Sequence, residues 1–211
     1  MSDSIRVMIY DKTALDDGFD IKIKNDQLTM SWVIGAKLYR AMRSVDIAHG
    51  VSSWEEALEW LATVEPGKTI SQIQIWGHGW PGHAYIGAER IDRSITLPLH
   101  KHNRALARVR DRLTPESIVW FRSCAMFAAE PGHAFAKDFS NFMGCRIAAH
   151  TYIIWVFQGG LRTIVPGQEP YWPLDEGIEE GPLSWPKKLK WAKPWTKNTI
   201  LAIRGTVPKG W

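Results

Sequence analysis

A histidine and a cysteine that each come soon after an apolar run are the residues of this chain best suited to covalent chemistry. His78 follows the run IQIW and lies between Gly77 and Gly79, and Cys124 closes the segment SIVWFRSC. A thiol attacks carbonyl carbon at neutral pH when a neighbouring imidazole lowers its pKa from about 8.5 or accepts its proton. The pair therefore predicts nucleophilic catalysis, provided that the fold brings the two side chains together.

Acyl transfer through Cys124 also needs N–H donors for the developing oxyanion. The backbone N–H groups of Gly79 and Cys124 are the candidates, and His78 would protonate the leaving amine. Trp80 follows Gly79 in the sequence and is a candidate lining residue of the crevice between His78 and Cys124. Asp11, at the end of an apolar run, is a candidate third residue that orients His78, and this rests on its position alone.

The remaining cysteine and histidines have ordinary structural interpretations. Cys145 follows Gly144, opens an apolar segment and is expected in the core, with a disulfide to Cys124 as the alternative. The other histidines lack a metal-binding spacing such as H-E-x-x-H, so neither a metal nor another cofactor is expected. Besides His49, these histidines are His83, His100, His102, His133 and His150.

Strands and helices alternate along the first three quarters of the chain. Apolar runs predict strands and apolar spacing with capping residues predicts helices. The expected strands are Ile5–Asp11, Ile70–Trp76, Ser117–Cys124, a segment from Arg146 and the final segment NTILAIRGTV, with a hairpin at AYIGAERI. The expected helices are two between Gly35 and Val64, broken near His49 and Gly50, then Lys101–Leu113 and Gly132–Met143.

This alternation predicts an α/β three-layer sandwich with a mainly parallel central sheet and helices on both faces. Ligands bind such sheets beyond the carboxyl ends of the strands, where His78 and Cys124 are expected. We expect residues 1–165 to form this domain. Residues 166–211 are irregular and rich in Trp and Pro, and we expect them to pack on the same domain and supply a last strand.

The motifs IQIWGHG and IVWFRSC resemble those of the caspase-like (clan CD) cysteine peptidases. The helix GHAFAKDFSNFMG and the strand CRIAAHTYII extend the resemblance to bacterial His-Gly and Cys caspase-like domains of uncharacterised role, over roughly residues 70–165. The resemblance implies a caspase-type sheet and peptide-bond cleavage, with His78 as general base and acid, Cys124 as nucleophile and Gly79 in the oxyanion hole. It also implies that His150 and Thr151 contribute to the substrate pocket.

Some family features are missing, which leaves other functions open. The segment RSCA lacks the local signature of the caspases, and no processing linker is recognisable. The leading hypothesis is a cysteine endopeptidase that acts on a protein or peptide through a Cys–His dyad. The alternatives are a catalytically inactive caspase-like interaction module and an α/β-hydrolase-type esterase, although the chain has no G-x-S-x-G elbow at FRSCAMF.

Composition restricts the partners and the location. Hydrophobic residues make up 45% of the 211 residues, no run is long enough to cross a bilayer, and no secretory signal is recognisable, so a cytoplasmic protein is expected. The net charge of +4 owes much to residues 186–211, which carry seven Lys or Arg and no acid. Lysines interleaved with tryptophans also suit single-stranded nucleic acid, but a packed arm is the simpler interpretation, and nucleic acid and membrane partners are not expected. The sequence does not predict the oligomeric state.

Overall fold

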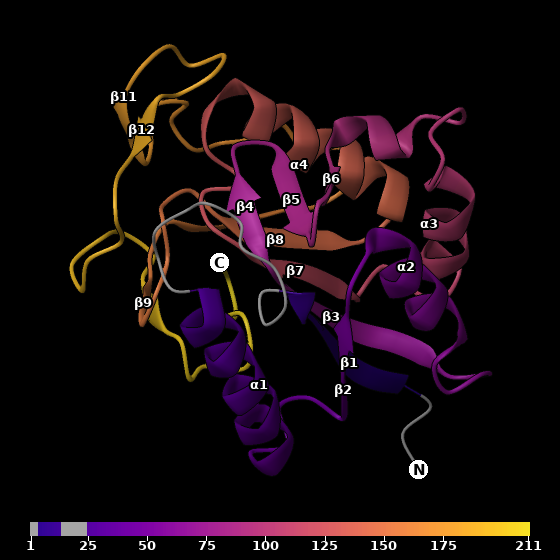
Figure 1. Ribbon diagram of the computed structural model, residues 1–211. Coiled ribbons are helices and arrows are strands. Elements are labelled where there is room, and N and C mark those ends of the chain that lie inside the picture. Colours follow the sequence, from indigo (N-terminus) through magenta and orange to yellow (C-terminus); the bar gives the residue numbers. More distant parts are fainter. Residues whose placement is uncertain (1–3, 14–24) are drawn as a thin grey trace.

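The computed structural model describes residues 4–13 and 25–211, with the side chains of residues 25–31 left out (Figure 1). Its helices are α1 (Asn25–Ala41), α2 (Trp54–Thr63), α3 (Asn103–Arg110), α4 (Ala129–Met143) and the 3₁₀ turn Arg93–Thr96. The longer strands are β1 (Ser4–Asp11), β2 (Ile47–Val51), β3 (Thr69–Trp76), β7 (Ile118–Arg122), β8 (Arg146–His150) and β10 (Leu161–Ile164). The short strands are β4 (His78–Trp80), β5 (His83–Ile86), β6 (Glu89–Ile91), β9 (Phe157–Gln158), β11 (Ile178–Glu180), β12 (Lys188–Leu189) and β13 (Ile200–Leu201).

A mostly parallel sheet of six strands forms the centre of the molecule. Its strand order is β10-β8-β7-β3-β1-β2, and only the pairing of β10 with β8 is antiparallel. The parallel strands are linked by helical crossovers, as the alternation in the sequence predicts. The expectation of an α/β fold with a mainly parallel sheet is confirmed.

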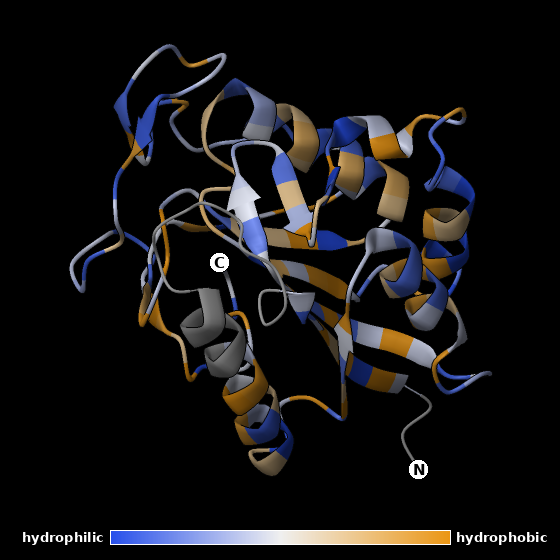
Figure 2. Cartoon of the chain, in the orientation of Figure 1, coloured by the Kyte–Doolittle hydropathy of each residue, from blue (hydrophilic) through white to orange (hydrophobic). Residues whose placement is uncertain are grey.

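Helices cover both faces of this sheet. On one face, α2, α3 and α4 bury the main core, in which Val7, Ile75 and Phe121 contribute from successive strands. On the other face, α1 packs Trp32, Ala36 and Tyr39 against Met8 and Trp76. Figure 1 shows α1 set apart from the other three helices, and Figure 2 shows the alternation of apolar and polar residues along the strands. Alternation of this kind places successive side chains on opposite faces.

The segment between Gly35 and Val64 differs from its prediction. We expected two helices with a break near His49 and Gly50, whereas those residues lie within β2, the edge strand beside β1. The reason is that β2 is short and mostly half-buried, so it lacks the apolar run that marks the central strands. The start of α2 is as predicted, since the Ser53 Oγ accepts a hydrogen bond from the Glu56 N–H at 3.1 Å.

The last quarter of the chain contacts the sheet without adding a strand to it. The expected final strand is reduced to β13, which pairs antiparallel with β9 outside the six-stranded sheet. Trp172 stacks on Phe127 at 5.3 Å between ring centroids and is buried in the main core. Residues 166–211 therefore contribute buried contacts to the domain, as a packed arm and not as a further layer.

Candidate active site

The strands that precede His78 and Cys124 are direct neighbours in the sheet. β3 pairs with β7 in parallel, with Trp76 opposite Arg122 at their carboxyl ends. The chain leaves both strands at the same edge, so His78 and Cys124 emerge beside one another. Each keeps some exposed surface, although the strand residues before them are buried. The adjacency of these two strands, which the sequence spacing could not prove, is present in the fold.

Gly79 brings the histidine loop into backbone contact with the cysteine loop. A Cβ atom on Gly79 would lie 2.5 Å from the carbonyl oxygen of Cys124 and 2.9 Å from its nitrogen. Any larger residue would force the two loops apart, because these contacts are with backbone and not with a flexible side chain. Glycine after His78 is therefore a packing requirement of this site.

His78 lies in a largely apolar setting. Its ring meets the edge of Trp32 at 5.6 Å between centroids, which connects the site to α1. Desolvation lowers the pKa of His78 below its usual value, and the charge of Asp11 opposes this shift. The imidazole is consequently neutral at pH 7 and can accept a proton.

Asp11 acts on His78 through its charge and is otherwise engaged elsewhere. Its buried carboxylate accepts hydrogen bonds from the Thr13 N–H and hydroxyl, each at 2.8 Å, and from the Gly87 N–H at 2.9 Å. These bonds attach the turn between β5 and β6 to the end of β1. Asp11 thereby positions the hairpin that follows His78, and no hydrogen bond joins it to the imidazole within the described residues.

Burial favours the protonated form of the Cys124 thiol. Its Sγ lies 3.8 Å from the carbonyl oxygen of Ile154, and desolvation raises the pKa of the thiol, an effect that this contact only partly offsets. Within the described part of the chain no hydrogen bond joins Cys124 to His78. The resting pair is thus a neutral thiol near a neutral imidazole, which differs from a preformed thiolate–imidazolium pair.

Two alanines after Cys124, one in the loop and one at the first residue of α4, lie in the left-handed region of backbone space. Ala125 has φ 50° and Ala129 has φ 60°, conformations that cost a residue with a Cβ about 1–2 kcal/mol each. The Ala125 N–H donates to the Tyr152 carbonyl and the Phe127 N–H donates to the His150 carbonyl, which fixes the loop to the end of β8 and to the residues after it. Strain of this kind is often found beside functional residues. Nothing in the sequence signals it, because alanine shows no preference for this conformation.

The three residues predicted for the substrate pocket differ in burial: Trp80 is half-buried, whereas His150 and Thr151 are buried. Trp80 lies beside Trp185, at 6.4 Å between ring centroids, and its role as a lining residue stays a prediction. His150 and Thr151 are fully buried at the end of β8. His150 contacts the Gly159 carbonyl oxygen through Nδ1 at 3.1 Å. Neither of these two side chains has exposed surface that could line an open pocket in this conformation.

A buried ion pair that the sequence did not single out holds the segment after β8. Glu176 pairs with Arg162 at 2.5 Å and accepts a hydrogen bond from the Thr151 hydroxyl at 2.7 Å. Both charged side chains are at least nine-tenths buried. Because this pair joins β10 to residue 176 across a long loop, no local pattern could have revealed it.

Cys145 is a core residue, as expected, and both cysteines are free, so the alternative of a disulfide is excluded. Burial raises the pKa of the Cys145 thiol to about 12. Among the residues that the structure describes, no group of three or more His, Cys, Asp or Glu side chains is arranged to hold a metal ion. The described helices include none that is both long enough and apolar enough to cross a membrane.

Comparison with known families gives a match for part of this chain. Residues 32–154, more than half of the chain, match a family described as a domain of unknown function (DUF4347). This range begins within α1 and includes the His-Gly and Cys segments of the candidate site. A search of curated proteins gives no significant match.

Proposed function

The chain belongs to the DUF4347 family, and from the geometry of its site we propose that it is a caspase-like cysteine endopeptidase with Cys124 as nucleophile and His78 as proton carrier. The observation that carries this proposal is the pairing of β3 with β7, which sends His78 and Cys124 into the same edge of the sheet. Ligands bind open parallel sheets at this edge.

Three further observations support a catalytic role. Gly79 is held against the Cys124 backbone, so the histidine loop and the cysteine loop form one unit. The imidazole is neutral at pH 7 and can act as a base. The backbone after Cys124 is strained and tightly bonded, which fixes the position of the nucleophile.

The proposed reaction proceeds from the neutral pair. As the Cys124 sulfur attacks the scissile carbonyl carbon, its proton passes to His78. The oxyanion is stabilised by backbone N–H groups, for which Gly79 and Cys124 are the candidates, and the Cys124 N–H donates no hydrogen bond within the described residues. His78 then protonates the leaving amine as the C–N bond breaks, and water hydrolyses the thioester, returning the proton to the thiol.

The test is mass-spectrometric labelling of the folded protein with a library of peptidyl electrophiles. We expect modification of Cys124, none of Cys145, and a fall in rate of about 10²-fold or more in His78→Ala, because general-base catalysis typically contributes at least that much. Cys124→Ala should abolish labelling. Equal labelling in wild type and His78→Ala, or an unlabelled Cys124, contradicts the proposal.

Gly79→Ala provides a second test of the same geometry. The added methyl group must displace the Cys124 backbone, so we expect a large loss of labelling with the protein still folded by circular dichroism. The matched control is Gly35→Ala on α1, where the nearest atoms to an added Cβ lie at 3.9 Å and alanine favours the helix. Labelling in this control should equal that of wild type.

The alternative is a catalytically inactive interaction module, and the state of Cys124 favours it. Desolvation raises the thiol pKa, and among the described residues the Sγ contacts the Ile154 carbonyl oxygen and not His78. Such a module would show slow labelling of Cys124 that does not depend on His78, and the same experiment therefore separates the two functions. An esterase would instead be revealed by turnover of ester substrates that Cys124→Ala leaves intact.

A further inference from the structure

Helix α1 exposes a row of apolar side chains on the side away from the sheet. Ile34, Leu38 and Met42 follow one another at a spacing of four residues and are 59%, 41% and 50% exposed. Residues at this spacing lie above one another along a helix, although Met42 is just past the end of α1. Trp32, Ala36 and Tyr39 pack against the sheet from the opposite side of α1, and Ile34, Leu38 and Met42 belong to none of the described core clusters.

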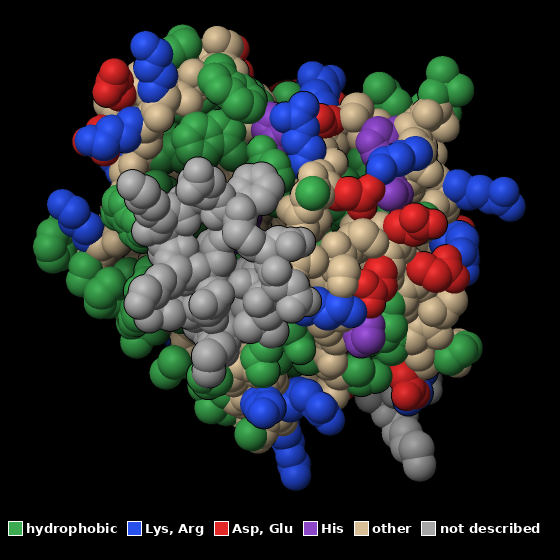
Figure 3. Space-filling model, viewed as in Figure 1, with side chains coloured by type: hydrophobic (Ala, Val, Ile, Leu, Met, Phe, Trp, Pro, Cys, Tyr) green, Lys and Arg blue, Asp and Glu red, His purple; other side chains and the backbone are tan. Residues whose placement is uncertain are grey.

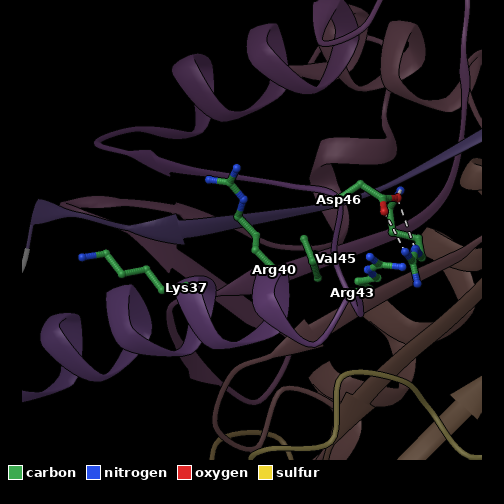
Figure 4. Close-up of a pocket in the computed structure, with 6 residues that line it drawn as sticks. Lys37, Arg40, Arg43, Val45 and Asp46 are labelled. Atoms are coloured by element: carbon green, nitrogen blue, oxygen red, sulfur yellow. Dashed lines mark hydrogen bonds and ion pairs between the residues drawn. The ribbon is translucent and has the colours of Figure 1, made fainter.

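Cations border this row along one side. Lys37, Arg40 and Arg43 line a surface depression of about 570 Å³ with Val45 and the ion pair between Arg6 and Asp46 (Figure 4). The carboxylate of Asp46 forms an ion pair with Arg6 at 2.6 Å and so does not neutralise the other cations. Within the described part of the chain, Lys37, Arg40 and Arg43 form no ion pair, so the depression carries an unbalanced positive charge.

The C-terminal segment extends the apolar surface along the other side. Ala202 accepts a hydrogen bond from the Tyr39 hydroxyl, and Gly205 lies against Ser44, so residues 201–205 run beside the end of α1. Leu201 and Ile203 are about half exposed there. Figure 3 shows hydrophobic and basic side chains gathered over this end of the molecule. We call Ile34, Leu38, Met42, Lys37, Arg40 and Arg43 the α1 surface.

We propose that the α1 surface binds an amphipathic segment of a partner protein that carries apolar side chains next to carboxylates. The apolar side chains of the segment would lie along Ile34, Leu38 and Met42, and its carboxylates would enter the depression beside Arg40 and Arg43. Charge complementarity identifies the partner as acidic, and the apolar row supplies the buried contact that an ion pair alone lacks.

A protein segment fits this surface better than a lipid bilayer does. On α1 itself the apolar row is one residue wide, whereas helices that lie in a membrane interface present a broad apolar face. The cations line a shallow, open depression, which carboxylate side chains can enter. Helix-in-groove and helix-on-helix recognition uses anchors at this same spacing of three and four residues.

The experiment is selection of peptides of about 16 residues, roughly four helical turns, from a displayed library against the full chain. The double variant K37E/R40E serves for counter-selection. We expect enriched peptides to combine Asp or Glu with apolar residues at helical spacing. Their affinity should fall about tenfold or more in K37E/R40E and in I34Q/L38Q. It should also fall as ionic strength rises from about 0.1 M to about 1 M, because the Debye length shrinks from ~10 Å to ~3 Å.

The matched control is R104E/K197E, which makes the same charge change at exposed cations on α3 and the C-terminal arm. It should bind the selected peptides as wild type does, and thermal unfolding should show all three variants to be folded. The proposal is overturned by enriched peptides without acids, by equal loss in the control, or by no enrichment at all. Binding to phosphatidylserine vesicles that depends on Lys37 and Arg40, or self-association that I34Q/L38Q abolishes, would assign the surface to a membrane or to a second copy instead.

Discussion

Burial changes the pKa values of His78, Cys124 and His150 more than the charges of neighbouring residues do. His150 has no exposed surface, and its Nδ1 donates to the Gly159 carbonyl, which leaves Nε2 as a buried nitrogen without a partner among the described residues. Desolvation lowers the pKa of His150 to about 3. The same cause, in weaker form, lowers the pKa of His78, and it raises the pKa of Cys124.

The pKa of His150 predicts a dependence of stability on pH. In the unfolded chain the imidazole titrates near 6.5 and in the folded chain near 3, so the unfolded state binds more protons between these values. The contribution of His150 to the free energy of unfolding is therefore fully present above pH 6.5. It falls as the pH decreases toward 3, by up to about 1.4 kcal/mol per pH unit.

His150→Asn removes this titration, and denaturant unfolding of both proteins at pH 5 and pH 7.5 is the measurement. The variant should be less stable than wild type at pH 7.5 because a buried hydrogen bond is disturbed, and the difference should narrow at pH 5. Parallel losses in the two proteins would show that His150 does not contribute. His150→Gln offers the same comparison if the asparagine variant fails to fold.

At the scale of elements, one buried arginine joins the sheet to the C-terminal segment. Arg122, at the end of β7, lies on the face that α1 covers, opposite to its neighbour Phe121, as alternation along the strand predicts. Its guanidinium donates to the carbonyl oxygens of Ala202 and Arg204 and to the Gln158 amide oxygen, at 2.7–2.9 Å for the shortest bonds. It also lies over the rings of Trp76 and Trp120, at 4.3 and 4.1 Å. Desolvation lowers its pKa to about 10, so it remains a cation.

Arg122→Met should release this segment. The substitution removes a donor from each of the Ala202 and Arg204 carbonyl groups, of which Ala202 keeps the Tyr39 hydroxyl, so we expect a loss of about 2–4 kcal/mol in the free energy of unfolding. Hydrogen exchange of the Ala202 and Arg204 amides should accelerate more than that of the sheet. Arg104→Met on α3 is the control, with an expected change within about 0.5 kcal/mol. Unchanged exchange at residues 202 and 204 would contradict the role given to Arg122.

At the scale of the whole molecule, the irregular last quarter is part of the stability of the domain. Trp172 fills a position in the main core, and its Nε1 donates to the Phe127 carbonyl at 2.8 Å. Residues 183–192 pack on the loop after Cys124 through Leu183 and Leu189. The arm therefore supports both the core and the candidate site.

A chain that ends at Val165 should consequently lose cooperative unfolding. The truncation would expose the face of the Phe127 ring, leave Arg162 without its partner Glu176 and remove the carbonyl groups that Arg122 binds. Each of these changes costs at most several kcal/mol, and together they compete with a total stability of about 5–15 kcal/mol. Urea unfolding followed by circular dichroism is the measurement. A chain that lacks only residues 208–211 should unfold cooperatively, and near-normal stability of residues 1–165 would show that the arm is dispensable.

The sequence by itself determined the elements whose signal is local. β1, β3 and β7 are apolar runs, and α2 and α4 carry their own start and stop signals, Ser53 before α2 and Gly144 after α4. The order of these elements was sufficient to predict a mostly parallel sheet in an α/β fold, because strand–helix–strand crossover units have one favoured handedness. It also placed His78 and Cys124 at the carboxyl ends of strands.

Only the tertiary structure decided what those residues meet. The pairing of β3 with β7, the contact of Gly79 with Cys124, and the desolvation that sets the pKa values of His78, Cys124 and His150 all depend on segments far apart in the sequence. The left-handed Ala125, the Arg162–Glu176 pair and the anchoring by Arg122 left no local trace. Local patterns report backbone preference and one-sided burial, whereas contacts between distant segments are settled by packing of the whole chain.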